Sequence, residues 1–484
     1  MFQTLKNAWK VPELKSKLLF TLLIVLLYRI GASIPLPWIS SEIYHQFQAA
    51  SAGSMFQYLN LLSGDSFSRA TLFALSVSPY ITASIVMQLL TIAIPALERM
   101  AKDGENGKKK ITAITRIVTV ALALITAYGY TMFLETQFKA FVTYASLENN
   151  WALWFCRITL ILCYCAGASL IMWLAEKINE KGIGNGISII LFANIVSRVP
   201  QYLTQTIPSI CKFVTQDLAE PQPVIATILN VVIYIAVVAV IIAAFGFVVW
   251  FTGSERRIPI QYAKRVVGRK MYGGQSSNLP LKLNMSGVMP IIFANSIVAL
   301  PATVAAFFTF VPSKDHWLYF AKDFIVGLND FFAQLTDVMN YNSPLYLVIF
   351  IALIIAFSYF YIMISFNPVE VANNIRNNGG SIPGIRPGKP TIDYIKKILN
   401  RVTLTGGLFL CIISGLPLLF VIVANFFVNL DPATTTLIDQ QFVGALSELA
   451  FSGSSLLIVV GVALETVREL EAQITLRNYK GFLD

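Results

Sequence analysis

Charged side chains are scarce in this chain of 484 residues. Only 13% of the residues are charged and 56% are hydrophobic, whereas a typical soluble domain carries about 25% charged residues. This composition excludes an ordinary water-soluble protein and indicates an integral membrane protein. Ten apolar runs fill most of the chain and leave no length for a separate soluble domain.

Histidine, cysteine and membrane-embedded acids are also rare. The only two histidines, His45 and His316, fall in gaps between apolar runs, which argues against a histidine-based catalytic or metal centre at depth. The five cysteines lack a metal-binding pattern, so we expect them to serve packing. Proton-coupled carriers usually place several acidic groups within the membrane, whereas the apolar runs hold a single acidic residue, Glu448 in the tenth. We therefore expect no enzyme activity, no cofactor and no metal site.

The apolar runs are expected to be membrane-spanning helices. Most hold the ~20 residues that cross a bilayer core, and they are too long for barrel strands. The fifth is the weakest, because its clearly apolar part, Ile187–Val199, is short. The ten expected spans are Leu18–Pro35, Thr71–Ile94, Ile117–Leu134, Trp151–Ala175, Gly184–Leu203, Val224–Phe251, Met285–Phe310, Leu345–Phe366, Val402–Phe427 and Phe442–Leu464.

Basic residues gather in alternate gaps between these spans. Lys and Arg precede the first span, crowd residues 99–116, 252–284 and 367–401, and recur in the tail. The intervening gaps are acidic or neutral. Because Lys and Arg are retained on the cytoplasmic side, this alternation predicts a multi-pass protein with both termini in the cytoplasm.

Several local features depart from a plain apolar helix. The stretch Met55–Leu62 is apolar but too short to span, so it is either an interfacial helix or a re-entrant segment packed inside the protein. Pro79 is expected to interrupt the second span near one end, Gly182–Gly186 opens the fifth, and Pro290 sits early in the seventh. Arg29 lies within the first span, where we expect a structural role.

Two basic loops are longer than a topological signal requires. Arg256–Lys282 and Arg376–Lys397 combine positive charge with turn-forming Gly and Pro, which predicts a defined structure rather than a flexible tether. Exposed basic loops suit a polyanionic partner, such as ribosomal RNA, anionic lipid or an acidic protein face.

A set of motifs in a fixed order then points to a family. They are Tyr28–Gly31, Asn60–Gly64, Phe73–Leu75, Pro79–Ile85, Gly182–Ser188, Tyr262–Arg265, Gln275–Asn284 and Ile382–Gly388. On these motifs the chain resembles the SecY family, the central subunits of the bacterial protein-translocation channel. The resemblance implies an all-α integral membrane fold of ten transmembrane helices, in two pseudo-symmetric five-helix halves around a central pore. The halves would be residues 1–203, with a plug at about 53–64, and 204–484, with large cytosolic loops at 252–284 and 367–401.

The resemblance also implies site residues. An apolar pore ring would consist of Val77, Ile81, Ile187, Leu191, Ile292 and Ile458. The spacing of 77/81 and 187/191 supports this independently, because residues four apart share one helix face. The plug would be formed by Met55, Phe56, Tyr58, Leu59 and Leu62, although the text after it, Ser63-Gly64-Asp65-Ser66, departs from the usual Ser-Gly-Gly-Ala. Gln88 and Asn295 would lie on the helices of the lateral gate.

The implied function is a protein-conducting channel subunit. It would move unfolded secretory proteins across the bacterial plasma (inner) membrane and release membrane proteins laterally into lipid. Implied partners are the small subunits SecE and SecG, the motor ATPase SecA, the ribosome, signal sequences and nascent polypeptides. The motor and ribosome would dock on Arg256, Arg257, Lys264, Arg265, Arg269, Lys270, Arg386 and Lys389. Two alternatives are a secondary transporter with inverted repeats, which should show polar midplane groups, and an intramembrane protease.

Overall fold

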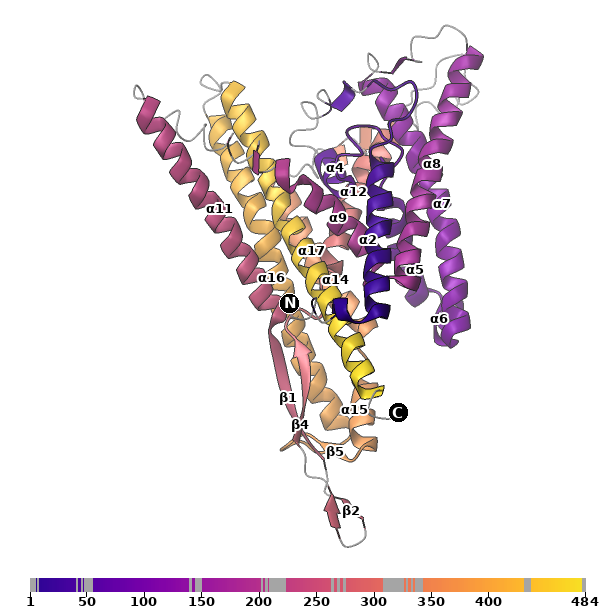
Figure 1. Cartoon of the computed structure of the whole chain (residues 1–484), viewed down its shortest axis with the longest axis vertical. Helices are drawn as coiled ribbons and strands as arrows, with labels where there is room; N and C mark the ends of the chain where they lie inside the picture. Colours follow the sequence, from indigo (N-terminus) through magenta and orange to yellow (C-terminus); the bar gives the residue numbers. More distant parts are fainter. Residues whose placement is uncertain are drawn as a thin grey trace.

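The computed structural model describes most of the chain. The described residues are 6, 8–40, 42–44, 47, 55–138, 142–143, 150–201, 203–204, 208, 223–262, 265–267, 270–272, 276–307, 326–327, 330–331, 334–335, 343–430 and 437–480. Within them, long helices run side by side, and a small β-structure extends beyond one end of the bundle (Figure 1).

Each of the ten expected spans corresponds to a helix. In the first part of the chain these helices are α2 (Pro12–Ala32), α5 (Ser78–Ala93), α7 (Gly104–Gln137), α8 (Asn150–Lys181) and α9 (Gly186–Gln201). In the second part they are α11 (Pro223–Gly253), α12 (Met289–Phe307), α14 (Pro344–Ser365), α16 (Lys389–Leu430) and α17 (Leu437–Lys480). By length and composition alone, five helices among the described residues can cross a membrane, and one bent pair would make a sixth.

The bent pair lies in the second expected span. Helix α5 is followed after Ile94 by α6 (Pro95–Lys102), which turns by 101°. The expectation that Pro79 interrupts its helix is wrong, because Pro79 is the second residue of α5. Pro290 lies early in its helix as expected, at the second residue of α12. A proline there loses no hydrogen bond, since the first amides of a helix have no partner within it. The second span also begins later than expected, because residues 64–77 form turns.

The two basic loops fold together into one small unit. Strands β1 (Glu255–Tyr262), β4 (Ser276–Lys282) and β5 (Gly380–Ser381) form an antiparallel sheet in the order β4-β1-β5. β2 (Arg265–Val267) pairs with β3 (Lys270–Tyr272) in a separate hairpin. This sheet packs with α15 (Pro368–Asn377) and the start of α16 around a buried core that includes Ile258, Ile260 and Leu281. The expected defined structure of these loops is therefore present.

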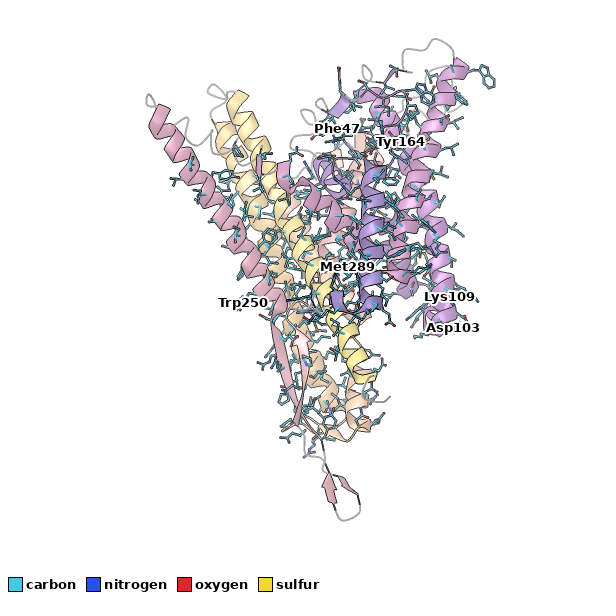
Figure 2. The ribbon with its side chains drawn as sticks, in the orientation of Figure 1. Phe47, Asp103, Lys109, Tyr164, Trp250 and Met289 are labelled. Atoms are coloured by element: carbon cyan, nitrogen blue, oxygen red, sulfur yellow. The ribbon has the colours of Figure 1, made fainter. Side chains whose placement is uncertain are left out.

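The sheet was not predicted from the sequence, although a signal for it exists. Ile258, Ile260 and Tyr262 alternate with exposed residues, which is typical of a half-buried strand. Figure 1 shows the sheet at the end of the bundle where α2 begins and α17 ends. Lys109 of α7 lies towards the same side, and Tyr164 lies at the opposite end (Figure 2). The basic loops and the first and last described helix ends thus share one side.

The helices are held together by two apolar clusters. A large central cluster draws buried residues from α2, α5, α8, α9, α12, α14, α16 and α17. A second cluster joins α7 and α8 to the segment between α2 and α5. Helix α12 packs against both α5 and α14, so the first and second parts of the chain meet along α5 and α12.

Candidate functional site

The six residues expected to form a pore ring all belong to the central apolar cluster or pack against it. Val77 at the start of α5, Ile81, Leu191, Ile292 and Ile458 are all buried members of the central cluster, and Ile187 is half-buried and packs against it. They come from four helices, α5, α9, α12 and α17. The structure therefore brings together side chains separated by up to several hundred residues in the chain. A narrow contact of branched apolar side chains from separate helices excludes water and ions.

A short helix, α4 (Met55–Ser63), abuts this cluster from the end of the bundle away from the sheet (Figure 1). Its residues Leu61 and Leu62 are buried members of the central cluster, and Leu59 packs against it. The segment is therefore inside the protein along this part of its length. The side chains of Met55, Phe56 and Tyr58 lie outside the described ones, so their placement stays a prediction.

A polar network fixes the end of α4 to two neighbouring helices. Asn194 of α9 donates from Nδ2 to the Leu62 carbonyl at 2.7 Å and to the Tyr28 hydroxyl at 2.8 Å. Its Oδ1 accepts from Arg29 Nη1 at 3.3 Å, and the Leu62 carbonyl also accepts from Ser76 Oγ at 3.2 Å. Buried polar groups are costly when unpaired, so this network favours one position of α4. Arg29 thus has the structural contact expected of it.

A second network of polar side chains connects the end of α4, the loop that follows it and α9. Asn60 Nδ2 donates to Asp65 Oδ1 at 3.1 Å, and the Ser68 amide donates to Asn60 Oδ1 at 3.0 Å. Arg198 Nε lies 3.2 Å from Asp65 Oδ1, which makes a buried ion pair between this loop and α9.

Sequence reasoning missed Asn194 and Arg198. A signal was available, because Ile187, Leu191, Asn194 and Arg198 follow helical spacing and therefore share one face of α9. Two polar residues on an otherwise apolar face suggest a polar partner. Nothing in the sequence identifies that partner, since it lies more than a hundred residues away.

The gate residues lie on neighbouring helices without bonding to each other. Gln88 is half-buried on α5, and Asn295 is 2% exposed on α12. Asn295 Nδ2 has no hydrogen-bond partner among the described residues. A buried amide without a partner costs about 1–3 kcal/mol, so the closed packing around α12 is less stable than full pairing would make it.

The basic residues expected to dock partners are exposed where they are described. Arg256 and Arg257 project from β1, and Arg386 and Lys389 are exposed on the second loop. The side chains of Arg265 and Lys270 lie outside the described ones, as do Lys264 and Arg269 altogether.

The turn around Arg386 is well defined. Gly384 and Gly388 adopt positive φ angles of 79° and 109°, which glycine tolerates far better than other residues. The Thr391 hydroxyl donates to the Arg386 carbonyl at 2.9 Å and closes the turn.

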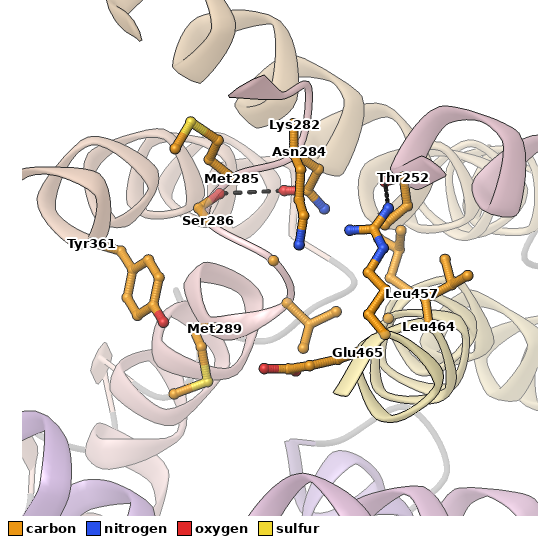
Figure 3. Close-up of a pocket in the computed structure, with 14 residues that line it drawn as sticks. Thr252, Lys282, Asn284, Met285, Ser286, Met289, Tyr361, Leu457, Leu464 and Glu465 are labelled. Atoms are coloured by element: carbon orange, nitrogen blue, oxygen red, sulfur yellow. Dashed lines mark hydrogen bonds between the residues drawn. The ribbon is translucent and has the colours of Figure 1, made fainter. Parts of the chain in front are cut away.

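A hollow with both polar and apolar lining residues lies where the sheet meets the helices. Its volume is about 160 Å³, and it is lined by residues at the end of β4, the start of α12 and the lower part of α17 (Figure 3). Burial, followed by repulsion from Arg468, lowers the pKa of Lys282 below its usual value. Burial likewise raises the pKa of Glu465, and Lys282 opposes that shift. Elsewhere, no group of three His, Cys, Asp or Glu side chains converges within the described residues to hold a metal.

These features define a multi-pass helical membrane protein with a central apolar contact, a short internal helix against it and a basic platform at one end. A family profile described as SecY matches residues 71–467, which is most of the chain. The chain therefore belongs to the SecY family, and the resemblance seen in its motifs is confirmed.

Curated relatives and solved structures agree with this assignment. The protein translocase subunits SecY of Thermus thermophilus and Streptomyces galbus are 38% and 37% identical over all of this chain, covering 98% and 100% of their own lengths. The fold is similar to a solved structure titled as a protein conducting channel, with a TM-score of 0.54, 17% identity and 96% of each chain covered. It is also similar to Sec61 from a canine ribosome-channel complex, with a TM-score of 0.51 and 15% identity over 96% of each chain.

Proposed function

We propose that this chain is the pore subunit of a membrane channel that conducts unfolded proteins. The proposal is supported by Ile81, Leu191, Ile292 and Ile458, which come from four helices and are all buried in the central apolar cluster. Branched apolar side chains seal against ions when they touch, and they offer no fixed polar contact to a passing chain of any sequence. The family's members are translocase subunits, which is consistent with this role.

Helix α4 is the plug of this channel in our proposal. It packs against the central cluster and is held to α9 by the hydrogen bond from Asn194 to the Leu62 carbonyl. Displacement of α4 by a translocating chain would break that bond and expose the cluster to water. The contact between α5 and α12 would be the lateral exit into lipid, where the unpaired amide of Asn295 lowers the cost of separation.

The basic platform is the docking surface for partners. Arg256, Arg257, Arg386 and Lys389 are exposed, and the sheet, α15 and the first turns of α16 hold them on a common core. Lys264, Arg265, Arg269 and Lys270 belong to the same loop. We propose that the motor ATPase SecA and the ribosome bind here, and that SecE and SecG complete the channel. Sec61 has been solved in a ribosome-channel complex, which supports the ribosomal part of this proposal.

The platform side is the cytoplasmic side in this proposal. Lys and Arg concentrate on it, and both α2 and α17 have their outer ends there (Figure 1), as the positive-inside rule requires. The chain would then lie in the bacterial plasma membrane with both termini in the cytoplasm. The two halves, 1–203 and 204–484, would separate along α5 and α12.

A secondary transporter is disfavoured by the same central contact. Transporters bind substrate near the midplane with polar or charged groups. Polar side chains do lie beside the central cluster, but Arg29, Asn194 and Arg198 contact groups of this chain: one another, the Leu62 carbonyl and Asp65. An intramembrane protease would require a nucleophile and a base at that depth, and both histidines fall in gaps between the expected spans.

Site-specific photo-crosslinking tests the proposal. A photoreactive amino acid is placed at Ile292, or at lipid-exposed Leu90 as the matched control, and a secretory precursor is stalled during ATP-driven transport into proteoliposomes. We expect the stalled precursor to crosslink at position 292 and not at position 90. Transport without a crosslink at 292 would mean that the path does not pass the apolar contact, and absence of transport would contradict the channel assignment itself.

A further inference from the structure

The loop after α4 contains a residue in a conformation that it does not adopt readily. Asp65 has a φ of 69°, in the left-handed region. The SecY family resemblance would place glycine here, and glycine adopts this φ without steric cost. Aspartate is tolerated better than most residues, yet it still persists in this conformation only when its surroundings hold it.

The surroundings of Asp65 supply a reason for an acidic residue. Its carboxylate lies 3.2 Å from Arg198 Nε and accepts a hydrogen bond from Asn60 Nδ2 at 3.1 Å. The side chains of Arg198 and Asp65 are only 3% and 10% exposed. One carboxylate therefore joins α4, through Asn60, to α9, which carries Ile187 and Leu191.

The electrostatic consequence depends on the position of α4. A guanidinium that is buried without a counter-ion is strongly unfavourable, whereas a hydrated one is not. While α4 is docked, Asp65 supplies the counter-ion. If Asp65 is neutralised, the docked state loses this counter-ion, and undocking offsets the loss by hydrating the guanidinium. The ion pair therefore favours the docked position of α4 over the undocked one, while it contributes less to the free energy of unfolding of the whole protein.

We infer that Asp65 and Arg198 form a charged latch that positions the plug in the closed channel. This inference rests on the proposed role of α4 as a plug. It adds that docking of α4 is controlled by a specific ion pair as well as by the Asn194 hydrogen bonds. A translocating polypeptide must open this pair before α4 can leave.

Resting conductance in planar bilayers tests the latch. The purified channel, with its small subunits, is compared with Asp65→Asn, Arg198→Gln and the double variant. Each single variant should raise the resting open probability about tenfold or more, since residues in direct contact couple by that order of magnitude. The double variant, which leaves no unpaired charge, should be much closer to wild type than the product of the two single effects. A merely structural role would lower yield and thermal stability without this non-additive gating effect.

Two further variants protect the test from misfolding and from general effects of charge. Asp65→Gly removes the carboxylate but accepts the φ of 69°, so it should insert normally and still raise the open probability. The control is the ion pair of Arg157 with Glu135, whose closest atoms are 2.6 Å apart between α7 and α8 and which does not touch α4. Arg157→Gln and Glu135→Gln should leave the resting conductance unchanged.

The outcomes separate the latch from the proposed function. If wild type transports precursors but Asp65→Gly and Asp65→Asn stay as tightly closed as wild type, the latch is refuted and the channel assignment stands. Simple multiplication of the two single effects would also refute it, because uncoupled residues do not form a latch. If wild type neither seals nor transports, the proposed function fails.

Discussion

Replacement of Ile81 by asparagine should make the resting channel leak. Ile81 is 4% exposed and lies in the central cluster with Leu191, Ile292 and Ile458. Loss of its buried apolar surface removes about 2 kcal/mol from the closed state. The new amide meets apolar neighbours, and an unpaired buried amide costs a further ~1–3 kcal/mol.

Together these two losses weaken the closed contact by about 3–5 kcal/mol. A change of about 1.4 kcal/mol shifts an equilibrium constant tenfold. Part of this loss falls on the folded protein as a whole, so we expect at least a tenfold rise in resting open probability. The equilibrium shifts towards the open state because water in an open pore can hydrogen-bond to the asparagine, whereas the apolar side chains of the closed cluster cannot. Planar-bilayer recording of the purified channel measures the effect.

Two variants calibrate the result. Ile81→Val removes one methylene group and should cost only about 0.5–1.5 kcal/mol, with a correspondingly small change in conductance. Leu90→Asn changes the exposed face of the same helix and should not alter conductance. The assignment of Ile81 to the seal would be refuted if Ile81→Asn and Ile187→Asn together left the resting conductance at the wild-type level.

Three other changes test the remaining parts. Deletion of 55–62 should raise resting conductance while all ten spans stay inserted; crosslinking of Phe56 to lipid headgroups would instead indicate an interfacial helix. Arg386→Glu and Arg386→Lys should both reduce ATP-driven transport with topology intact, because Lys lacks the planar guanidinium fork; wild-type transport by Arg386→Glu would leave its charge as a topological signal only. Ile260→Ala should destabilise the basic platform, the unit formed by the sheet, α15 and the start of α16, by about 2–4 kcal/mol. Limited proteolysis should then cleave both basic loops faster than in the wild type. Equal cleavage rates would contradict a shared core.

The helical spans were predictable because each membrane-buried helix requires its own continuous run of apolar residues. Around twenty apolar residues are needed to cross the bilayer, and Lys and Arg mark one side, so each span can be read without knowledge of its neighbours. Helix starts were less accessible. Pro79 looked like an interruption, and only the backbone shows that α5 begins at Ser78.

The sheet of the basic loops shows a different limit. The alternation in 258–262 was present in the sequence, but β5 is two residues long and pairs with β1 across more than a hundred residues. So short a strand has no signal of its own. It exists because the partner strand and the Ile375 and Ile395 side chains are brought to it by the folding of the whole chain.

The sequence by itself determined the membrane class, the ten spans, the basic loops and the motifs that carry the family resemblance. Only the tertiary structure decided that α4 rests against the central apolar contact and that Asn194 and Arg198 hold it there. The physical reason is that burial and charge pattern are properties of single segments. A buried hydrogen bond or ion pair is a property of two segments, and its partner is fixed by how distant helices pack.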